Sequence, residues 1–258
     1  MGYGMDLGIK GRKAVVTGAS TGIGKSVALG LAREGVEIFM SSRDQTRLDA
    51  AVGEVQQSGG LVHSLAADVT TAAGCSAIAD AALAQFGTVD ILINNAGNSR
   101  PRPAGDFDEQ AWWDEAMALN FSSTRRLTDA LLPAMRDQGW GRIINLTGAM
   151  TSPKSNAAGP AKAALWSWSR TVSVEAAPFG VTVNCVQPGR INTPQILERL
   201  VPTEAARQAE IERGIPIGRF GDPDELAILV VFLASEPARY INGTQIPVDG
   251  GMLRMAMP

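Results

Sequence analysis

Thr17-Gly18-Ala19-Ser20-Thr21-Gly22-Ile23-Gly24 is the stretch that decides the fold of this chain. It follows a short apolar run and leads into an Ala- and Leu-rich segment with helical periodicity. Gly18 allows a tight turn, Gly22 lets the backbone approach a pyrophosphate, and Gly24 allows the helix to pack closely on the strand. The free amides and the positive dipole of the helix start favour phosphate binding. A tight strand-to-helix turn without a ligand is the alternative interpretation.

Short apolar runs alternate with longer helical segments along the rest of the chain, which is typical of parallel strands joined by crossover helices. Strands are expected at 13–17, 37–41, 62–66, 91–94, 141–146, 182–186 and 245–248. Helices are expected at 24–34, 46–58, 72–86, 108–136, 161–179 and 223–233. The pattern predicts one α/β domain over residues 1–258, with a doubly wound, seven-stranded parallel sheet whose ligands bind beyond the carboxyl ends of the strands.

Composition narrows the classes of function. The 23 basic and 26 acidic residues form no basic run, which argues against nucleic acid as a partner and favours a small-molecule substrate. Cys75 and Cys185 are far apart and His63 is the only histidine, so neither a metal site nor a Cys-His nucleophile is expected. No apolar run approaches the roughly 18 to 20 residues that span a bilayer, so we expect no membrane association and a cytoplasmic location.

Further motifs recur at defined positions after the glycine-rich turn. They are Asn94-Asn95-Ala96-Gly97, Asn120, Pro188-Gly189-Arg190-Ile191-Asn192-Thr193 and Val248-Asp249-Gly250-Gly251. In order and spacing the chain resembles the short-chain dehydrogenase/reductase family, and within it the branch of the oxoacyl-carrier-protein reductases. The resemblance implies a Rossmann-type domain, a homotetramer, and hydride transfer between a nicotinamide and a small carbonyl or alcohol.

The same resemblance implies a set of cofactor-binding residues. Asp68 and Val69 would flank the adenine, Asn95 and Gly97 would line the dinucleotide, and Ile191 and Thr193 would meet the nicotinamide carboxamide. The full set is Gly18, Ser20, Thr21, Gly22, Ile23, Gly24, Ser42, Arg43, Asp68, Val69, Asn95, Ala96, Gly97, Lys162, Pro188, Gly189, Ile191 and Thr193.

The end of the second expected strand indicates which nicotinamide binds. Ser42 can donate a hydrogen bond to a 2′-phosphate and the Arg43 guanidinium can pair with its oxygens, which favours NADP over NAD. If the Asp44 carboxylate rather than Arg43 faces the ribose, NAD is the cofactor. Thr21 stands where many NADP-binding relatives carry a second basic residue. A solvated surface charge is the alternative role for Arg43.

The catalytic positions depart from the family. Its members use Asn, Ser, Tyr and a lysine four residues beyond the tyrosine. Asn120 and Lys162 match, but the serine position falls on Gly148 and the tyrosine position on Ala158. An alanine methyl cannot transfer the proton that carbonyl reduction requires. The intervening segment is also shorter than in typical relatives, so four residues remain as candidate hydroxyls: Thr147, Thr151, Ser152 and Ser155.

Lys162 is the best remaining proton donor. Because Pro160 suits a first helical turn, we expect the helix to begin there, with Lys162 in the first turn. Burial and the helix dipole should both lower the pKa of this lysine. Its alternative role is to hold the nicotinamide ribose without taking part in chemistry. Within one chain, no other residue is expected near enough to replace the catalytic tyrosine; the residues considered are Tyr3, Tyr240 and His63.

Two further segments are expected near the substrate. Arg100 and Arg102 lie in a proline-stiffened loop and would suit an anionic substrate, or they are solvated loop charges. Residues 195–215 resemble the lid that covers the substrate in this family.

Three functions follow from these observations. The first is an NADP-dependent oxidoreductase with an atypical active site. The second is a non-redox lyase, decarboxylase or dehydratase on the same scaffold, and the third is a pseudoenzyme that binds nucleotide without turnover.

Overall fold

Seven parallel strands form one sheet in the computed structural model of the chain, which describes residues 5–150 and 154–252. Their order across the sheet is β3-β2-β1-β4-β5-β6-β7, so the chain winds outward from β1 in both directions. The strands are β1 (Lys13–Thr17), β2 (Glu37–Ser42), β3 (Val62–Ala66), β4 (Ile91–Asn94), β5 (Gly141–Leu146), β6 (Val181–Pro188) and β7 (Gln245–Val248). The predicted doubly wound parallel sheet is confirmed.

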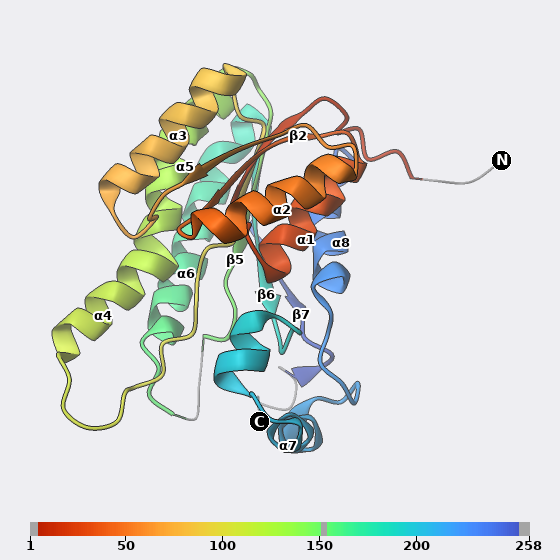
Figure 1. Cartoon of the computed structure of the whole chain (residues 1–258). Helices are drawn as coiled ribbons and strands as arrows, with labels where there is room; N and C mark the ends of the chain where they lie inside the picture. Colours follow the sequence, from red (N-terminus) through yellow and green to blue (C-terminus); the bar gives the residue numbers. More distant parts are fainter. Residues whose placement is uncertain (1–4, 151–153, 253–258) are drawn as a thin grey trace.

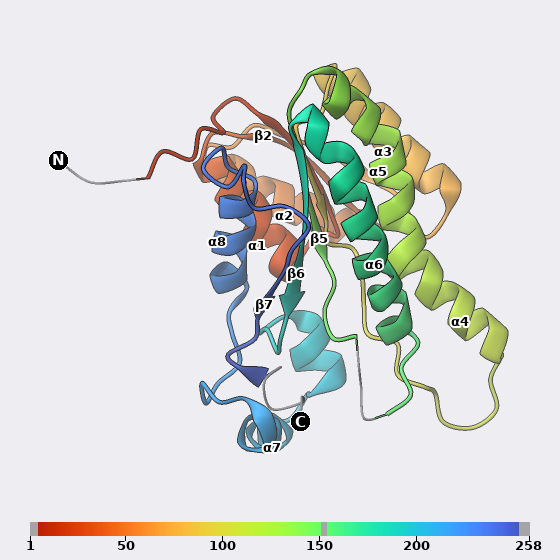
Figure 2. The same ribbon diagram turned by 180° about the vertical axis from the view of Figure 1, so that it is seen from behind.

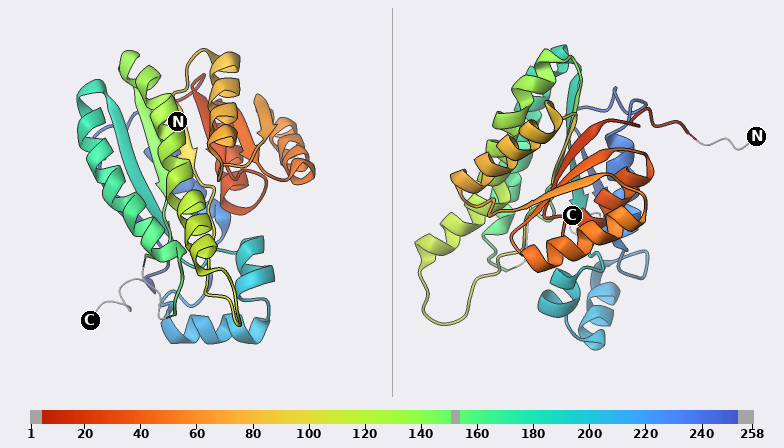
Figure 3. Two further views of the ribbon diagram at one scale, coloured as in Figure 1. Left: turned by 90° about the vertical axis from the view of Figure 1, so that its left-hand side faces the viewer. Right: turned by 45° about the horizontal axis from the view of Figure 1, so that its top comes forward.

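Helices cover both faces of the sheet (Figure 1). One face carries α1 (Gly22–Arg33), α2 (Gln45–Gln57) and α8 (Pro223–Leu233), and the other carries α3 (Ala72–Phe86), α5 (Ser123–Asp137) and α6 (Ala158–Ala176). The remaining helical segments are α4 (Glu109–Met117), η1 (Ala118–Ser122), η2 (Ala177–Phe179), η3 (Gln195–Leu200) and α7 (Glu204–Gly214). Both views in Figure 3 show η3 and α7 projecting beyond the end of the sheet.

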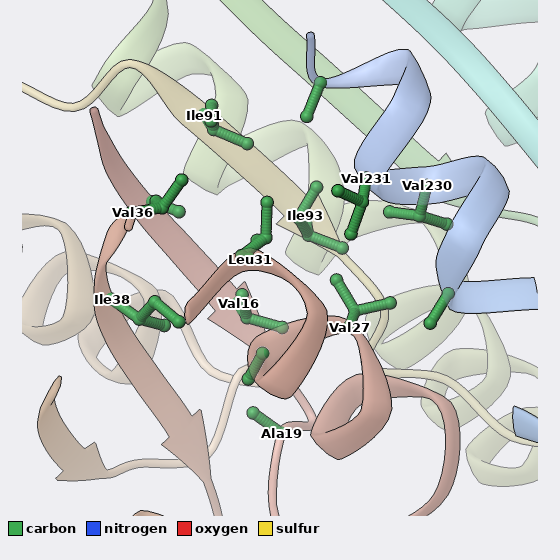
Figure 4. Packing of buried hydrophobic residues seen from close by; sticks show 14 of the residues in the cluster. Val16, Ala19, Val27, Leu31, Val36, Ile38, Ile91, Ile93, Val230 and Val231 are labelled. Atoms are coloured by element: carbon green, nitrogen blue, oxygen red, sulfur yellow. The ribbon is translucent and has the colours of Figure 1, made fainter. Parts of the chain in front are cut away.

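Two neighbouring residues of β1 show how the sheet is buried. Val15 belongs to the core cluster that includes side chains of α3 and α5, whereas Val16 belongs to the cluster that includes α1 and α8. Successive side chains of a strand point to opposite faces, so both valines are fully buried. Figure 4 shows Val16 among Val27 and Leu31 of α1. Burial on both faces explains why central strands such as β1 and β4 are apolar runs in the sequence.

The helix predicted over residues 108–136 is interrupted, so this prediction is wrong in one respect. The structure has α4, then the π-helical turn η1, then α5. Asn120 Nδ2 donates to the carbonyl oxygen of Ala116 (3.0 Å), and Ser123 Oγ donates to that of Leu119 (2.7 Å). Such side-chain bonds compete with the regular backbone ladder. A π turn leaves the apolar pattern on either side unchanged, so sequence periodicity could not reveal it.

α6 begins at Ala158 and not at Pro160, which corrects the second helix prediction. The N–H of Ala158 donates to Asn156 Oδ1 (3.0 Å), and the N–H of Gly159 donates to the Asn156 carbonyl oxygen (3.2 Å). Pro160 has no N–H that needs a partner. Asn156 therefore accepts the first open N–H groups of the helix, and α6 starts two residues before Pro160. Lys162 consequently lies in the second turn of α6 rather than the first.

The carboxyl ends of the strands lie at the same end of the molecule as α7. In Figure 2 the arrowhead of β6 points toward this end. The segments that follow β1, β4 and β6 meet there, which is where the sequence placed the ligand site. Of the helices in the described part of the chain, none is long and apolar enough to cross a membrane.

Candidate active site

The turn after β1 leaves little room for a side chain at its three glycine positions. Gly18 and Gly22 have φ of +62° and +55°, a region that favours glycine. A Cβ on Gly24 would lie 2.4 Å from both Asn95 Nδ2 and the Gly18 carbonyl oxygen. A Cβ on Gly22 would lie 3.0 Å from the Thr193 methyl group. The turn is therefore closely packed from both sides.

Asn95 ties this turn to the segment that follows β4. Its Nδ2 donates to the carbonyl oxygens of Thr17 (2.9 Å) and Gly18 (3.0 Å). In return, Thr17 Oγ1 accepts hydrogen bonds from the backbone N–H groups of Asn95 and Ala96, both at 3.1 Å. The side chain of Asn95 is thus committed to holding the turn, and Ala96 and Gly97 follow directly beside it.

The start of α1 keeps its backbone donors open. Thr21 is the N-cap residue, but its side chain makes no capping hydrogen bond to α1. Ser20 Oγ instead lies 2.8 Å from Ser42 Oγ at the end of β2. Uncapped amides at a helix N-terminus suit an anion such as a pyrophosphate. Ile23 is in the first turn and packs partly against the core.

Arg43 and Asp44 have different environments at the end of β2. Arg43 is exposed, whereas Asp44 is the N-cap of α2 and its Oδ1 accepts the Arg47 N–H at 3.0 Å. The Asp44 carboxylate is therefore engaged with α2. This observation favours the interpretation in which Arg43 and Ser42 meet a 2′-phosphate, and removes the reason to expect NAD.

A cleft of about 300 Å³ lies next to Ser20 and Thr21. Lys25 in its wall forms an ion pair with Glu54 of α2 at 2.9 Å. The full lining is Ser20, Thr21, Lys25, Arg47, Ala50, Ala51, Glu54, Pro194 and Glu198.

The residues expected around the adenine follow β3. Asp68 Oδ1 accepts hydrogen bonds from the N–H (2.9 Å) and Oγ1 (2.8 Å) of Thr70. Val69 is 5% exposed, and its side chain belongs to the core cluster on the α3 side. The structure therefore places both residues in the turn after β3.

The segment after β6 is anchored before it reaches the glycine-rich turn. The N–H of Gly189, which follows Pro188, donates to the Val248 carbonyl oxygen (2.9 Å). Ile191 is 3% exposed, and its side chain belongs to the core cluster on the α1 side. Of the two residues expected at the carboxamide, Thr193 is the one whose side chain lies beside Gly22.

Asn120 and Lys162 converge on Gly97. A Cβ on Gly97 would lie 3.1 Å from Asn120 Oδ1 and 3.9 Å from Lys162 Nζ. Asn120 is buried, and its Oδ1 accepts the N–H of Asn98 at 3.1 Å. Lys162 Nζ donates to the carbonyl oxygen of Thr147. Burial lowers the pKa of Lys162 to about 8 because it disfavours the charged ammonium.

The two positions at which the sequence predicts that the family's serine and tyrosine are absent lie next to Lys162. Ala158 is one helical turn earlier on α6 and is 2% exposed. Gly148 has a φ of +86°, and a Cβ there would lie 2.9 Å from Lys162 Nζ. Any side chain at residue 148 would therefore be strained and would press on the ammonium.

The structure describes two of the four residues that could supply a replacement hydroxyl, Thr147 and Ser155. Thr147 is buried, and its Oγ1 donates to the Val186 carbonyl oxygen (3.2 Å), away from Lys162. Ser155 is exposed. Thr151 and Ser152 lie outside the described residues.

The two loop arginines are paired with glutamates of α4. Arg100 Nη2 forms an ion pair with Glu115, and Arg102 Nη1 with Glu109 at 2.9 Å. Arg102 also lies over the ring of Phe107, with 5.0 Å from its Cζ to the ring centroid. These contacts fit a role in holding the loop to α4 better than a role in clamping an anionic substrate.

The segment expected to be a lid contains η3 and α7. Ile196, Val201 and Ile215 pack with Phe220 in a small core cluster of their own. Arg190, which follows β6, forms an ion pair with Glu210 of α7 at 2.5 Å. The segment is thus tied directly to the loop that carries Thr193.

Sequence reasoning missed Asn98 and Asn156. Asn98 donates its backbone N–H to Asn120, and Asn156 provides the first acceptor for α6. Asn98 directly follows the Asn-Asn-Ala-Gly motif, which could have drawn attention to it, but nothing local distinguishes Asn156. In the described ranges, no group of three or more His, Cys, Asp or Glu side chains could hold a metal ion.

The chain is similar to several known proteins. Residues 18–253 match the family model described as enoyl-(acyl carrier protein) reductase. The chain is 37% identical over 245 residues to a 3-oxoacyl-[acyl-carrier-protein] reductase of Synechocystis, covering 93% of this chain and 96% of the relative. It is 35% identical over 256 residues to a D-beta-hydroxybutyrate dehydrogenase of Cupriavidus necator, covering 94% and 98%.

One solved structure is similar over almost the entire chain. It is L-sorbose reductase of Gluconobacter frateurii complexed with NADPH and L-sorbose. The TM-score is 0.91 at 35% sequence identity, covering 97% of this chain and 99% of the reductase.

Proposed function

Because the chain belongs to the short-chain dehydrogenase/reductase family, we propose that it is an NADP-dependent oxidoreductase acting on a small carbonyl or alcohol through an atypical active site. The observation that carries this proposal is the convergence of Asn120 Oδ1 and Lys162 Nζ on Gly97, at the end of an intact dinucleotide cradle. The cradle needs glycine at residues 18, 22 and 24, which an ordinary strand-to-helix turn does not.

The cofactor is NADP. The residues present fit its 2′-phosphate, because Arg43 is exposed and the Asp44 carboxylate caps α2. The solved reductase named above carries NADPH at 35% identity. The bound nicotinamide would supply the hydride.

Replacing Arg43 by alanine is expected to weaken NADPH binding by about 10- to 100-fold, because a hydrogen bond to a charged group contributes about 1.5–3 kcal/mol. The affinity for NADH should change little. Titration of each nucleotide by fluorescence measures both dissociation constants. Asp44→Asn is the matched control, because asparagine still caps α2 and should leave the preference unchanged. Equal weakening of NADPH and NADH binding in Arg43→Ala would contradict this role.

We propose that Lys162 is the proton donor. During reduction its ammonium gives a proton to the carbonyl oxygen as the carbon accepts hydride, and the resulting amine regains a proton from solvent. A pKa of about 8 leaves the ammonium mostly protonated at neutral pH, yet makes it a better acid than an ordinary lysine. Asn120 orients the substrate side of the site through its contact with Asn98.

The test is turnover of carbonyl substrates with purified protein. L-Sorbose, 3-oxobutyrate and a 3-oxoacyl thioester represent the three relatives, and NADPH absorbance reports hydride transfer. Oxidation of NADPH that depends on one of these carbonyls supports the proposal. Turnover without consumption of NADPH would indicate a non-redox enzyme, and tight binding without any turnover would indicate a pseudoenzyme.

Restoring the family residues should not improve this site. Ala158→Tyr places a ring where the methyl group is already buried, and overpacking of that kind costs about 1–3 kcal/mol. Gly148→Ser adds strain at a positive φ and a contact with Lys162. We expect both changes, alone or together, to lower the Tm without raising kcat. If the double variant reduced carbonyls and the native protein did not, reduction would not be the native reaction.

The proposal also covers the assembly state of the protein, its cellular location and a substrate lid. Val174 of α6 is 72% exposed and Phe179 of η2 is 46% exposed, which supports a subunit interface on this face and the homotetramer. Sedimentation equilibrium measures the assembly state, and a monomer would contradict it. We also propose a cytoplasmic location and a substrate lid over residues 195–215.

A further inference from the structure

Asn156 connects two segments that flank the proposed active site. Its Oδ1 accepts the N–H groups of Arg100 and Ala158, both at 3.0 Å, and its Nδ2 donates to Ser99 Oγ at 2.8 Å. One side chain therefore holds the loop after β4 with two hydrogen bonds and the start of α6 with a third.

The backbone of the same segment is also paired with the loop. Asn156 and Pro101 form an antiparallel bridge. The N–H of Arg102 donates to the Ser155 carbonyl oxygen, and the N–H of Ala157 donates to that of Arg100, both at 3.0 Å. The contact is therefore a short piece of sheet with Asn156 at its centre.

Each of the linked segments leads to a residue of the site. The loop reaches Asn120 within two residues of Arg100, because the N–H of Asn98 donates to Asn120 Oδ1. α6 reaches Lys162 one turn after Ala158, since residues four apart lie on one face of a helix. A chain of hydrogen bonds thus runs from Asn120 through the loop and Asn156 to the helix that carries Lys162.

Asn156 is the side chain that joins the two segments, and each segment has a further contact of its own. The ion pairs of Arg100 with Glu115 and of Arg102 with Glu109 anchor the loop to α4. On the other side of the site, the Lys162 ammonium donates to the Thr147 carbonyl oxygen, and Gly148 beside it has no side chain. α6 packs directly against η1, which carries Asn120, and the docking of the start of α6 on the loop adds a second constraint on the distance between Asn120 and Lys162.

We propose that Asn156 is a positioning residue that docks the start of α6 on the loop after β4 and so sets where Lys162 lies relative to Asn120. An amide side chain suits this task because it offers two acceptor sites on one oxygen and a donor on the nitrogen. The inference deepens the proposed function and rests on it for the catalytic consequence.

Asn156→Ala removes all three side-chain hydrogen bonds at once. Lys162 should then become more accessible to water, and its pKa should rise by at least about half a unit. The chain contains five lysines, so NMR of protein labelled at lysine Cε can follow the Lys162 resonance through a pH titration. We also expect kcat to fall by about tenfold or more while KM changes less, because misplaced catalytic groups lower the rate of the chemical step.

Asn242→Ala is the matched control. Asn242 also bridges two segments, since its Oδ1 accepts the Val183 N–H (2.8 Å) and its Nδ2 donates to the Ser173 carbonyl oxygen (2.9 Å). It should lower the Tm but leave the Lys162 titration and kcat unchanged. If Asn156→Ala lowered the Tm in the same way and moved neither readout, Asn156 would be only structural and the inference would be overturned.

Two variants keep the test decisive if Asn156→Ala does not fold. Ser99→Ala removes only the bond to Nδ2, and Asn156→Ser keeps an acceptor for the N–H of Ala158. Both should shift the Lys162 titration in the same direction by a smaller amount, and no shift in either would overturn the inference. The titration needs no substrate, so it decides the role of Asn156 even if the native protein reduced no carbonyl and the proposed function failed.

Discussion

Replacing Lys162 by methionine is expected to lower kcat for NADPH-dependent carbonyl reduction by about 10²- to 10⁴-fold, which is the usual contribution of a general acid. Methionine has a similar length but carries no proton to donate. Burial lowers the pKa of Lys162 to about 8, so in the native protein kcat/KM for reduction should decline above pH 8 as the ammonium loses its proton. Alcohol oxidation needs the neutral amine and should instead increase up to that pH. Both pH profiles should lose this inflection in the variant.

Lys162→Arg separates the chemical role from the binding role. Arginine keeps the positive charge but does not release a proton in this pH range. We expect it to retain much of the NADPH affinity while kcat stays low and independent of pH. If Lys162→Met mainly raised the dissociation constant of NADPH and left kcat unchanged, Lys162 would hold the cofactor without donating a proton.

Replacing Gly24 by alanine is expected to abolish tight NADPH binding and to lower the free energy of unfolding by about 1–3 kcal/mol. The added Cβ would lie 2.4 Å from the Gly18 carbonyl oxygen and from Asn95 Nδ2, so the turn or the helix must move. Asn95 holds that turn through both Thr17 and Gly18, and the displacement would spread to the phosphate-binding backbone. Chemical denaturation measures the stability, and fluorescence titration measures the affinity.

Gly53→Ala is the control for this prediction. Gly53 lies within α2, and a Cβ there would meet nothing within 4 Å. Alanine at an unobstructed helical position should stabilise the protein by about 0.5–1 kcal/mol and leave the NADPH affinity unchanged. An intact NADPH affinity in Gly24→Ala would show that the turn is not the phosphate-binding element.

Local patterns predicted more of the fold than of the site. The apolar runs predict the central strands because β1, β2, β4, β5 and β6 are largely buried, and the differences from the predictions occur where side chains bond to the backbone. The side chains of Asn120 and Ser123 donate hydrogen bonds to the backbone at the π turn, and Asn156 Oδ1 accepts the N–H of Ala158 at the start of α6. The spacing of apolar residues along the sequence does not predict such hydrogen bonds.

The ion-pair and hydrogen-bond partners of three side chains at the site decide which of two possible roles each one has. Arg100 and Arg102 have the composition of an anion-binding loop, but glutamates of α4 neutralise them. Asp44 has the chemistry of a ribose ligand but serves as a helix cap. In each case the residue type was compatible with two roles, and the neighbouring element decided between them.

The sequence by itself determined the sheet and the glycine-rich turn, and it carries the prediction that Gly148 and Ala158 stand at the family's serine and tyrosine positions, because these depend on residue types at positions close together in the chain. Only the tertiary structure decided what surrounds Lys162. Its burial, its approach to Gly97 beside Asn120, and the link from Asn156 to Ser99 join residues that are tens of positions apart. Such contacts are set by how helices and loops pack on the sheet, which no local pattern encodes.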